Sequence, residues 1–363
     1  MSILIFIVIL LVLVLVHEAG HFFTAKKFGI RVDEFGFGFP PKLFGYKKGE
    51  TEYTFNLLPL GGFVKIHGEN PNEENTNGPD KGRSFANKPA WQQAVVLIAG
   101  VFANFLLAWV LFSWGLFAGI PTSVGNEVFD YPLENVQLVI VSVSAQSPAS
   151  QVGLQSGDAI VSLRRGEEKV ENLTPEALRS FVSSGEEIEV GYHREGQAVS
   201  YVKILPERDA PEDGPKIGVT MDQIGVVKMP VWLALKEGMK LTIGATKDTT
   251  VGLYKLIADS VKGQGSLDSV TGPVGLVGIV GDAYVFGFAY LLSFTAVISI
   301  NLAVINLMPF PALDGGRLFF LLIEKIKGSP VNPKFFNIAN IIGFSLLILF
   351  MVAVTYHDIT NIL

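Results

Sequence analysis

Four long runs of apolar residues divide the chain, and each is long enough to cross the hydrocarbon core of a bilayer as a helix. The runs cover about residues 2–24, 92–118, 284–308 and 338–356. One such run could be the core helix of a soluble protein, but four in one chain favour membrane spans. The pattern predicts a polytopic α-helical membrane protein with four transmembrane helices, in contact with the lipid bilayer.

The segment between the first two spans shows a different period. Residues 32–39 and 52–66 alternate between apolar and polar positions and are rich in aromatic side chains, which is typical of strands. Pro40-Pro41 is expected to break the first of them. Residues 57–63 are apolar for a loop, and such backbone enters a membrane only where protein covers it or water reaches it. We therefore expect a membrane-associated β element within residues 30–68.

A larger polar region follows the second span. Residues 135–207 contain several short alternating runs and predict a compact α+β domain inserted between the membrane halves. Residues 173–183 read as one of its helices, with Thr174 as the cap and Pro175 in the first turn. Ser147 to Ile160 follow the pattern S-P-A-x-x-x-G-L-x-x-G-D-x-I, which resembles the PDZ domains of bacterial proteases.

The PDZ resemblance implies that this region binds a peptide or a protein C-terminus as an added strand. The alternative is a spacer or size gate that binds nothing. Beyond it, residues 230–262 carry apolar residues at helical spacing, which predicts one or two amphipathic helices on the outer membrane surface.

Basic residues at the ends of the spans predict the orientation of the chain. Lys26 and Lys27 directly follow the first span, and Arg317, Lys325, Lys327 and Lys334 lie between the third and fourth. The positive-inside rule places both loops in the cytoplasm, so the termini and the PDZ-like domain are expected to be extracytoplasmic, in a bacterial cytoplasmic (inner) membrane. The expected organisation is two membrane halves, residues 1–118 and 270–363, flanking the PDZ-like domain and residues 230–262.

Composition narrows the possible chemistry. Hydrophobic residues make up 49% of the chain and charged residues 17%, and the mean hydropathy is +0.41, which agrees with a membrane protein. The net charge of −6 gives no reason to expect nucleic acid as a partner. The sequence contains no cysteine, so disulfides, thiol nucleophiles and cysteine metal sites are excluded.

The first span contains a metal-binding pattern. His17, Glu18 and His21 form H-E-x-x-H, whose spacing places both imidazoles on one face of a helix. Such side chains are costly inside a membrane unless a metal or a partner compensates them. A catalytic zinc site takes three protein ligands and leaves one position open, so a third ligand must come from elsewhere in the chain.

Asp314 is the best candidate for that third ligand. It follows the third span within Asn306 to Gly316 (NLMPFPALDGG), where two prolines and two glycines are expected to break the helix. The predicted topology brings the ends of the first and third spans to the same side of the membrane. The alternative for Asp314 is a helix cap or a turn residue.

These two motifs together resemble the site-2 protease family of intramembrane zinc metalloproteases, in its bacterial branch. The resemblance covers nearly the whole chain and implies a zinc-dependent endopeptidase that cleaves transmembrane segments of membrane proteins, such as anti-sigma factors or signal-peptide remnants. In that mechanism Zn²⁺ is held by the two histidines and the aspartate, and Glu18 is the general base. The departure is in the PDZ region, because the well-known Gram-negative members carry tandem PDZ domains and this chain holds one.

The family resemblance also implies further site residues. Gly100 and Asn104 resemble the family's G-x-x-x-N, in which the asparagine helps to hold the substrate or the developing oxyanion. The alternative for Asn104 is an interhelical hydrogen bond, with Gly100 allowing close approach of the helices. Asn306 and Pro311 resemble substrate-contacting positions. A segment resembling the β element that pairs with the unwound substrate contains Leu60, Gly61 and Gly62.

Two other functions are compatible with the same motifs. A metal transporter could use the same ligands, but it is expected to place further carboxylates or histidines in the other spans, and the second and fourth spans contain no acidic residue. A catalytically inactive PDZ scaffold is disfavoured because both histidines, the glutamate and the aspartate are intact.

Overall fold

The structure of the chain is a computed structural model. It describes residues 1–70, 77–124, 131–144, 146–170, 172–194, 197–207, 214–263, 270–285, 287–329 and 331–362. The chain forms two compact units, one made of residues 1–113, 235–281 and 293–363 and the other of residues 114–234 and 282–292. Each unit has its own hydrophobic core.

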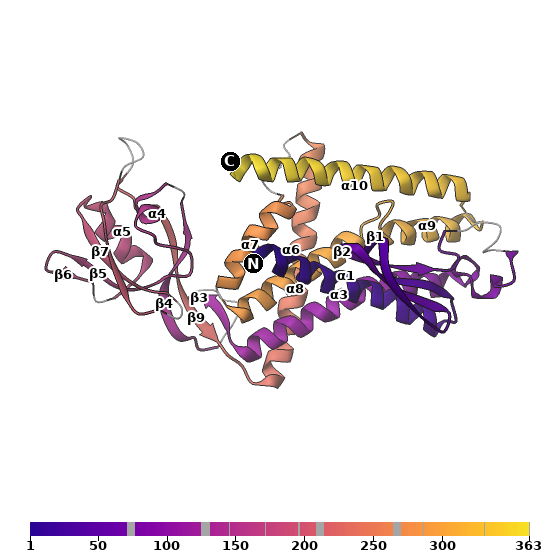
Figure 1. Ribbon diagram of the computed structural model, residues 1–363, viewed down its shortest axis with the longest axis horizontal. Helices are drawn as coiled ribbons and strands as arrows, with labels where there is room; N and C mark the ends of the chain where they lie inside the picture. Colours follow the sequence, from indigo (N-terminus) through magenta and orange to yellow (C-terminus); the bar gives the residue numbers. More distant parts are fainter. Residues whose placement is uncertain are drawn as a thin grey trace. The chain divides into compact units, whose positions relative to one another are not determined.

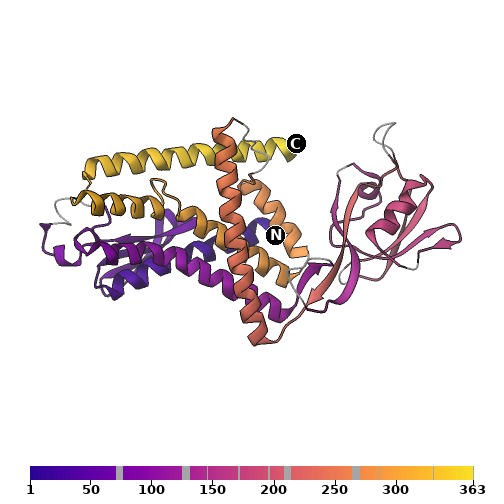
Figure 2. The same cartoon turned by 180° about the vertical axis from the view of Figure 1, so that it is seen from behind.

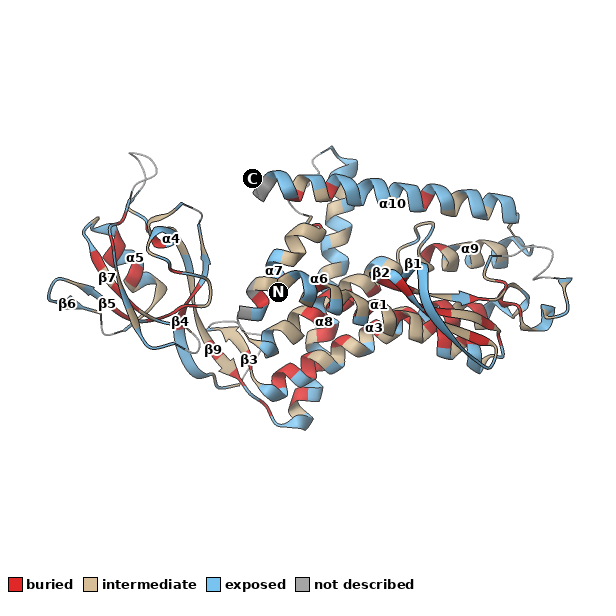
Figure 3. Cartoon of the chain, viewed as in Figure 1, coloured by how far each residue is buried: buried red, intermediate tan, exposed pale blue. Residues whose placement is uncertain are grey.

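Four helices of the described chain are long and apolar enough to cross a membrane: α1 (Ser2–Lys27), α3 (Ala90–Ala118), α8 (Phe288–Asn306) and α10 (Pro333–Ile362). The prediction of four spans is confirmed. The four candidate spans alternate in direction along the chain, and the N- and C-termini lie at the same end of the first unit (Figure 1). Most of α10 is exposed (Figure 3), as expected of a helix that faces lipid.

The third span is shorter than the sequence pattern predicted. A separate helix, α7 (Pro273–Val285), precedes it, and α8 begins only at residue 288. Gly287 between them has a φ of 100°, a conformation that no residue of an α-helix adopts. The apolar run is therefore continuous in sequence but not in helical structure.

The end of α10 is fixed to the start of α7 by a carboxylate. Asp358 of α10 is buried, and its two carboxylate oxygens accept hydrogen bonds from the backbone N–H groups of Gly272 and Gly275, at 3.1 and 2.8 Å. The first N–H groups of a helix have no partner within the helix, so an external acceptor stabilises them. Asp358 therefore caps α7 from another part of the chain.

The predicted amphipathic region, residues 230–262, is one continuous helix, α6 (Val231–Val261). Helix α6 runs at a steep angle to α10 in both ribbon views (Figures 1 and 2). It contacts two of the spans, because Trp109 of α3 donates its indole N–H to the carbonyl of Leu235 and Thr249 donates to Asn301 of α8. Its place on the outer membrane surface stays a prediction.

The loop after α1 forms a hairpin of two strands, β1 (Val32–Lys48) and β2 (Thr51–Ile66). The prediction that Pro40-Pro41 ends the first strand is wrong, because β1 continues past it with a shift in register from Phe39↔Leu58 to Lys42↔Asn56. Proline lacks an N–H to donate, and a strand tolerates it at a bulge or on an outer edge. The longer β1 extends the hairpin well beyond the predicted strands.

The hairpin folds back on itself. Gly36 pairs with both Thr54 and Phe63, so the first part of β1 lies between the two halves of β2. This arrangement places the end of β2 at an outer edge of the sheet. The core beneath it joins α1, the hairpin, the short 3₁₀ turn η2 (Phe85–Asn87), the start of α3 and α9 (Asp314–Lys327); a second 3₁₀ turn, η1 (Lys81–Arg83), precedes η2.

The second unit contains one antiparallel sheet and two short helices. Its sheet has the strand order β3-β9-β4-β5-β7-β8, with β6 beside β5 and every pair antiparallel. The strands are β3 (Ile120–Ser123), β4 (Glu134–Val143), β5 (Ala159–Arg165), β6 (Glu168–Lys169), β7 (Ile188–His193), β8 (Ser200–Ile204) and β9 (Val219–Val227). The helices are α4 (Pro148–Gln151) and α5 (Pro175–Ser183).

Local sequence signals explain these helices. The hydroxyl of Thr174 accepts a hydrogen bond from the backbone N–H of Ala177, and Pro175 occupies the first turn of α5, so the predicted cap is confirmed.

The aspartate of the G-D-x-I pattern, Asp158, is fully buried. Its carboxylate accepts two hydrogen bonds from Arg194 and one from the backbone N–H of Gln155. A buried carboxylate needs such partners, so this pattern fixes the turn before β5.

Candidate metal centre

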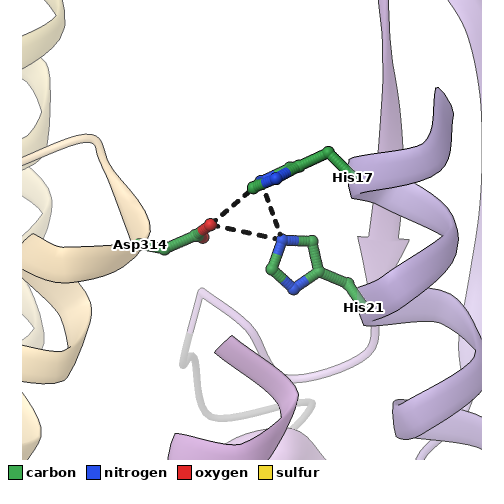
Figure 4. A group of neighbouring side chains, drawn as sticks. All are labelled: His17, His21 and Asp314. Carbon is green, nitrogen blue, oxygen red and sulfur yellow. Dashed lines mark hydrogen bonds and ion pairs between the residues drawn. The ribbon is translucent and has the colours of Figure 1, made fainter. Parts of the chain in front are cut away.

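The two histidines of H-E-x-x-H lie on the buried face of α1, one turn apart. Their side chains are about 7% exposed, and their Nε2 atoms are 3.1 Å apart (Figure 4). Two imidazole nitrogens at this distance cannot both carry a proton that points at the other. The pair is therefore arranged for a shared third partner rather than for a contact between themselves.

Asp314 supplies an oxygen to the same point. Its Oδ2 lies 3.0 Å from Nε2 of His17 and 3.3 Å from Nε2 of His21 (Figure 4). The carboxylate stands at the first residue of α9, after a tight turn that follows α8. A Cβ at Gly315 or at Gly316 would collide with backbone atoms of residues 307–311, so the two glycines allow the close packing that aims Asp314 at α1.

The ionisation of Asp314 suits a ligand. Burial alone would raise the pKa of its carboxyl, but hydrogen bonds and charge from the two histidines outweigh burial and hold that pKa below its ordinary range. The carboxylate is therefore ionised, as a metal ligand must be.

The three ligand atoms fit a tetrahedral zinc ion. Zinc–nitrogen and zinc–oxygen bonds of about 2.0–2.2 Å in tetrahedral geometry separate ligand atoms by roughly 3.3 Å. The three observed separations are 3.0, 3.1 and 3.3 Å. Among the residues that the structure describes, these three side chains are the one such group of possible ligands. Three protein ligands leave a fourth position open, as in catalytic rather than structural zinc sites.

Helix α3 holds the histidines from behind. A Cβ at Gly100 would lie 2.3 Å from Nε2 of His21, so only glycine leaves room for the imidazoles there. The Nδ1–H of His21 donates to the backbone carbonyl of Val96 at 2.8 Å. This hydrogen bond fixes the tautomer in which Nε2 is free to bind a metal.

A cavity of about 300 Å³ opens beside the three ligands. Glu18 lines it, together with residues of α1, β2, α8 and the turn before α9. Val64 of β2 lines the same cavity. The H-E-x-x-H glutamate therefore faces the space next to the metal position, within reach of a water molecule or substrate in that cavity.

Asn104 is also brought to the site, one turn of α3 beyond Gly100. Its amide lies 3.4 Å from Nδ1 of His17, and the side chain is fully buried. The hydroxyl of Ser299 on α8 donates to the backbone carbonyl of Asn104 at 2.9 Å. Asn104 thus reaches the side of His17 that faces away from Asp314, and it does not line the cavity.

The predicted substrate residues are divided between two places. Asn306, at the end of α8, lines the cavity. Pro311 instead packs against Gly343 of α10, where a Cβ would lie 2.4 Å from the proline carbonyl. Gly62 of β2 lies against Leu15 of α1, two residues before the first histidine. Gly61 is buried beside it, and the side chain of Leu60 lies outside the described residues.

Several groups at the site were missed by sequence reasoning. The carbonyl of Val96, which accepts from His21, is a backbone atom and carries no sequence signal. Glu69 also lines the cavity, and its carboxylate and carbonyl both bind the guanidinium of Arg317 on α9. The pairing of this glutamate with an arginine 248 residues later could not be read from the chain.

Comparisons with known proteins identify the relatives of this chain. The model of peptidase family M50 matches residues 5–350. The chain is similar to a zinc metalloprotease RasP of Geobacillus kaustophilus, at 32% identity over 99% of this chain and 97% of that protein. It is 36% identical to a putative zinc metalloprotease of Clostridium perfringens, over 96% and 95% of the two chains. It is 30% identical to the regulator of sigma-W protease RasP of Bacillus subtilis, over 98% of each.

The site predicts one tightly bound zinc ion per chain. We expect Asp314→Ala and His21→Ala each to abolish stoichiometric zinc in detergent-purified protein, because two ligands cannot complete the site. Asp248→Ala on α6, outside the site, is the matched control and is expected to keep the metal. Elemental analysis after dialysis against a weak chelator measures this. Full zinc occupancy in Asp314→Ala would show that another group is the third ligand.

Proposed function

The chain belongs to peptidase family M50 and is a membrane-embedded zinc metallopeptidase, and we propose that it cuts membrane-spanning segments of other proteins at the His17, His21 and Asp314 centre. The observation that carries the proposal is the position of this centre. Both histidines lie inside an apolar helix of 26 residues, and residues of three candidate spans, α1, α3 and α8, line the cavity beside them. A peptide bond cut there must itself reach the membrane.

The chemistry follows from the residues around the cavity. Zinc in the site would polarise the scissile carbonyl and lower the pKa of a water molecule. Glu18 accepts the proton of the attacking water and returns it to the leaving amine, which is the work of a general base that becomes a general acid.

The substrate is a transmembrane helix that unwinds locally, because an intact helix keeps its carbonyls in internal hydrogen bonds. The last part of β2 supports this proposal. Phe63, Val64 and Ile66 line the cavity at the outer edge of the hairpin. An extended substrate segment adding to this edge would satisfy its backbone hydrogen bonds as a strand and lie beside Glu18. Asn306 is placed to contact the same segment.

The general-base role predicts a large loss of rate on a small change. Glu18→Gln removes the proton acceptor but keeps the size and polarity of the side chain. We expect cleavage of a single-span model substrate to fall by about 10²–10⁴-fold, with zinc content unchanged. Glu237→Gln on α6 is the control and should cleave normally. Cleavage by Glu18→Gln at the wild-type rate would remove the proposed mechanism.

We infer that the β hairpin lies in the cytoplasm and the second unit on the opposite side of a bacterial membrane. Lys26 and Lys27 at the end of α1 and Lys325 and Lys327 at the end of α9 support this orientation. The four spans and the shared end of the two termini agree with both termini being extracytoplasmic.

The lack of cysteine makes the orientation directly testable. Single cysteines replace Lys47 at the hairpin and Glu168 on β6, both exposed residues. In intact cells, or spheroplasts where an outer membrane is present, a membrane-impermeant maleimide is expected to label Glu168→Cys at once and Lys47→Cys only after permeabilisation. The reverse labelling pattern would invert the proposed topology.

We further infer that the β-rich region is a PDZ-type module that binds peptides. A groove of about 360 Å³ lies between α5 and the start of β9. Apolar Ile217 and Val219 line its floor, and the side chains of Arg179 and Lys216 add two positive charges. Among the described residues, the first residues of β9 pair with β4 on one side and with no strand on the other, so their other edge can accept a strand. The preferred ligand is an extended apolar peptide with a carboxylate.

The charge of this groove gives a test of peptide binding. Arg179→Glu is expected to weaken binding of peptides with an apolar, free C-terminus to the full-length protein at least tenfold. Arg164→Glu, an exposed arginine on β5 outside the groove, should leave affinity unchanged. Fluorescence anisotropy with amidated and free-acid peptides measures the effect. Equal, negligible binding of both peptide types by the wild type would favour the spacer or size gate.

A further inference from the structure

The contact between Asn104 and His17 contains a conflict over one proton. The amide nitrogen of Asn104 faces Nδ1 of His17 at 3.4 Å, long for a hydrogen bond, and the amide oxygen is buried without a partner. An amide nitrogen only donates, so this orientation requires Nδ1 to be the acceptor. A neutral imidazole that accepts at Nδ1 carries its proton on Nε2.

That protonation state is incompatible with metal binding. Nε2 of His17 is the atom that faces His21 and Asp314, at 3.1 and 3.0 Å. A metal ligand must present a lone pair, so Nε2 must be free of its proton and Nδ1 must hold it instead. An N–H at Nδ1 needs an acceptor, because the site is fully buried on that side.

Rotating the amide by 180° resolves both problems. The oxygen and nitrogen of an asparagine amide are assigned from the hydrogen-bond network rather than seen directly. After the rotation, the oxygen that has no partner accepts the Nδ1–H of His17. The neighbouring histidine already shows this arrangement, since its Nδ1–H donates to the carbonyl of Val96.

We propose that Asn104 is a positioning residue whose amide oxygen accepts the Nδ1–H of His17 and so fixes the tautomer that binds the metal. The two histidines then receive equivalent support from one helix, α3, through a backbone oxygen for His21 and a side-chain oxygen for His17. Ser299 of α8 holds the backbone of Asn104 in turn, through its hydroxyl hydrogen bond.

This role differs from donating to the oxyanion of the substrate, which the family resemblance implied. Asn104 is 0% exposed and is absent from the cavity lining. A donor to the oxyanion must reach into the cavity, to within about 3 Å of the substrate oxygen. In the structure, the Asn104 amide lies against the imidazole of His17 instead.

Two substitutions separate the roles, because one keeps an acceptor and the other removes it. The carboxylate of Asn104→Asp can accept from Nδ1–H, but it cannot donate to an oxyanion. The similar-sized Asn104→Leu can do neither. Asn301→Leu on α8 is the matched control, since Asn301 is also an asparagine within a span but is bonded to Thr249. Zinc affinity is measured by chelator competition on the purified apo-proteins, and kcat and KM at saturating zinc.

The proposal predicts that Asn104→Leu binds zinc about 10–100-fold more weakly, while Asn104→Asp and Asn301→Leu bind it as tightly as the wild type. It also predicts that Asn104→Asp keeps most of its kcat. An oxyanion donor predicts the opposite pattern, with wild-type zinc affinity in both Asn104 variants and kcat lowered about 10²–10³-fold in both. That outcome would overturn the proposal. If Asn104→Leu does not fold, kcat and zinc affinity of Asn104→Asp decide alone.

Discussion

The structure depends on the meeting of two imidazoles and one carboxylate at a single point inside an apolar protein. His17 and His21 are nearly fully buried, and the carboxylate comes from a residue 297 positions after the first of them. Polar side chains in such surroundings are stabilised only by partners. His21 has the carbonyl of Val96 on the far side of its ring and His17 has the amide of Asn104, while Asp314 contacts both imidazoles. The glycines at 100, 315 and 316 give the backbone clearance that this approach requires.

The elements around the centre divide the work of catalysis. Helix α1 carries the two histidines and Glu18. Helix α3 packs against the histidines, and the turn after α8 positions Asp314. The hairpin adds the end of β2, whose residues Phe63, Val64 and Ile66 line the same cavity as Glu18. In the proposed mechanism, the strand that would accept the substrate therefore lies beside the base, which would link placement of the scissile bond to placement of the proton acceptor.

The chain reveals its chemistry more readily than its architecture. The spacing of H-E-x-x-H and the broken helix around Asp314 predicted ligands that the structure brings together, because side-chain identity and helical period are both written in the sequence. The contribution of Val96 could not be predicted, since any residue supplies the same backbone carbonyl. The prediction also placed the start of the third span too early, because an apolar run gives no sign that Gly287 takes a positive φ. The strand through Pro40-Pro41 was missed because a proline signals a break whether or not the sheet offers an edge.

The long separation between the ligands has a consequence for biosynthesis. A ribosome completes the first 313 residues before it adds the aspartate, so the nascent chain holds only two of its three ligands for most of its synthesis. With Asp314 as the third ligand, the zinc site can be complete only after the C-terminal part of the chain has been made and has packed against α1.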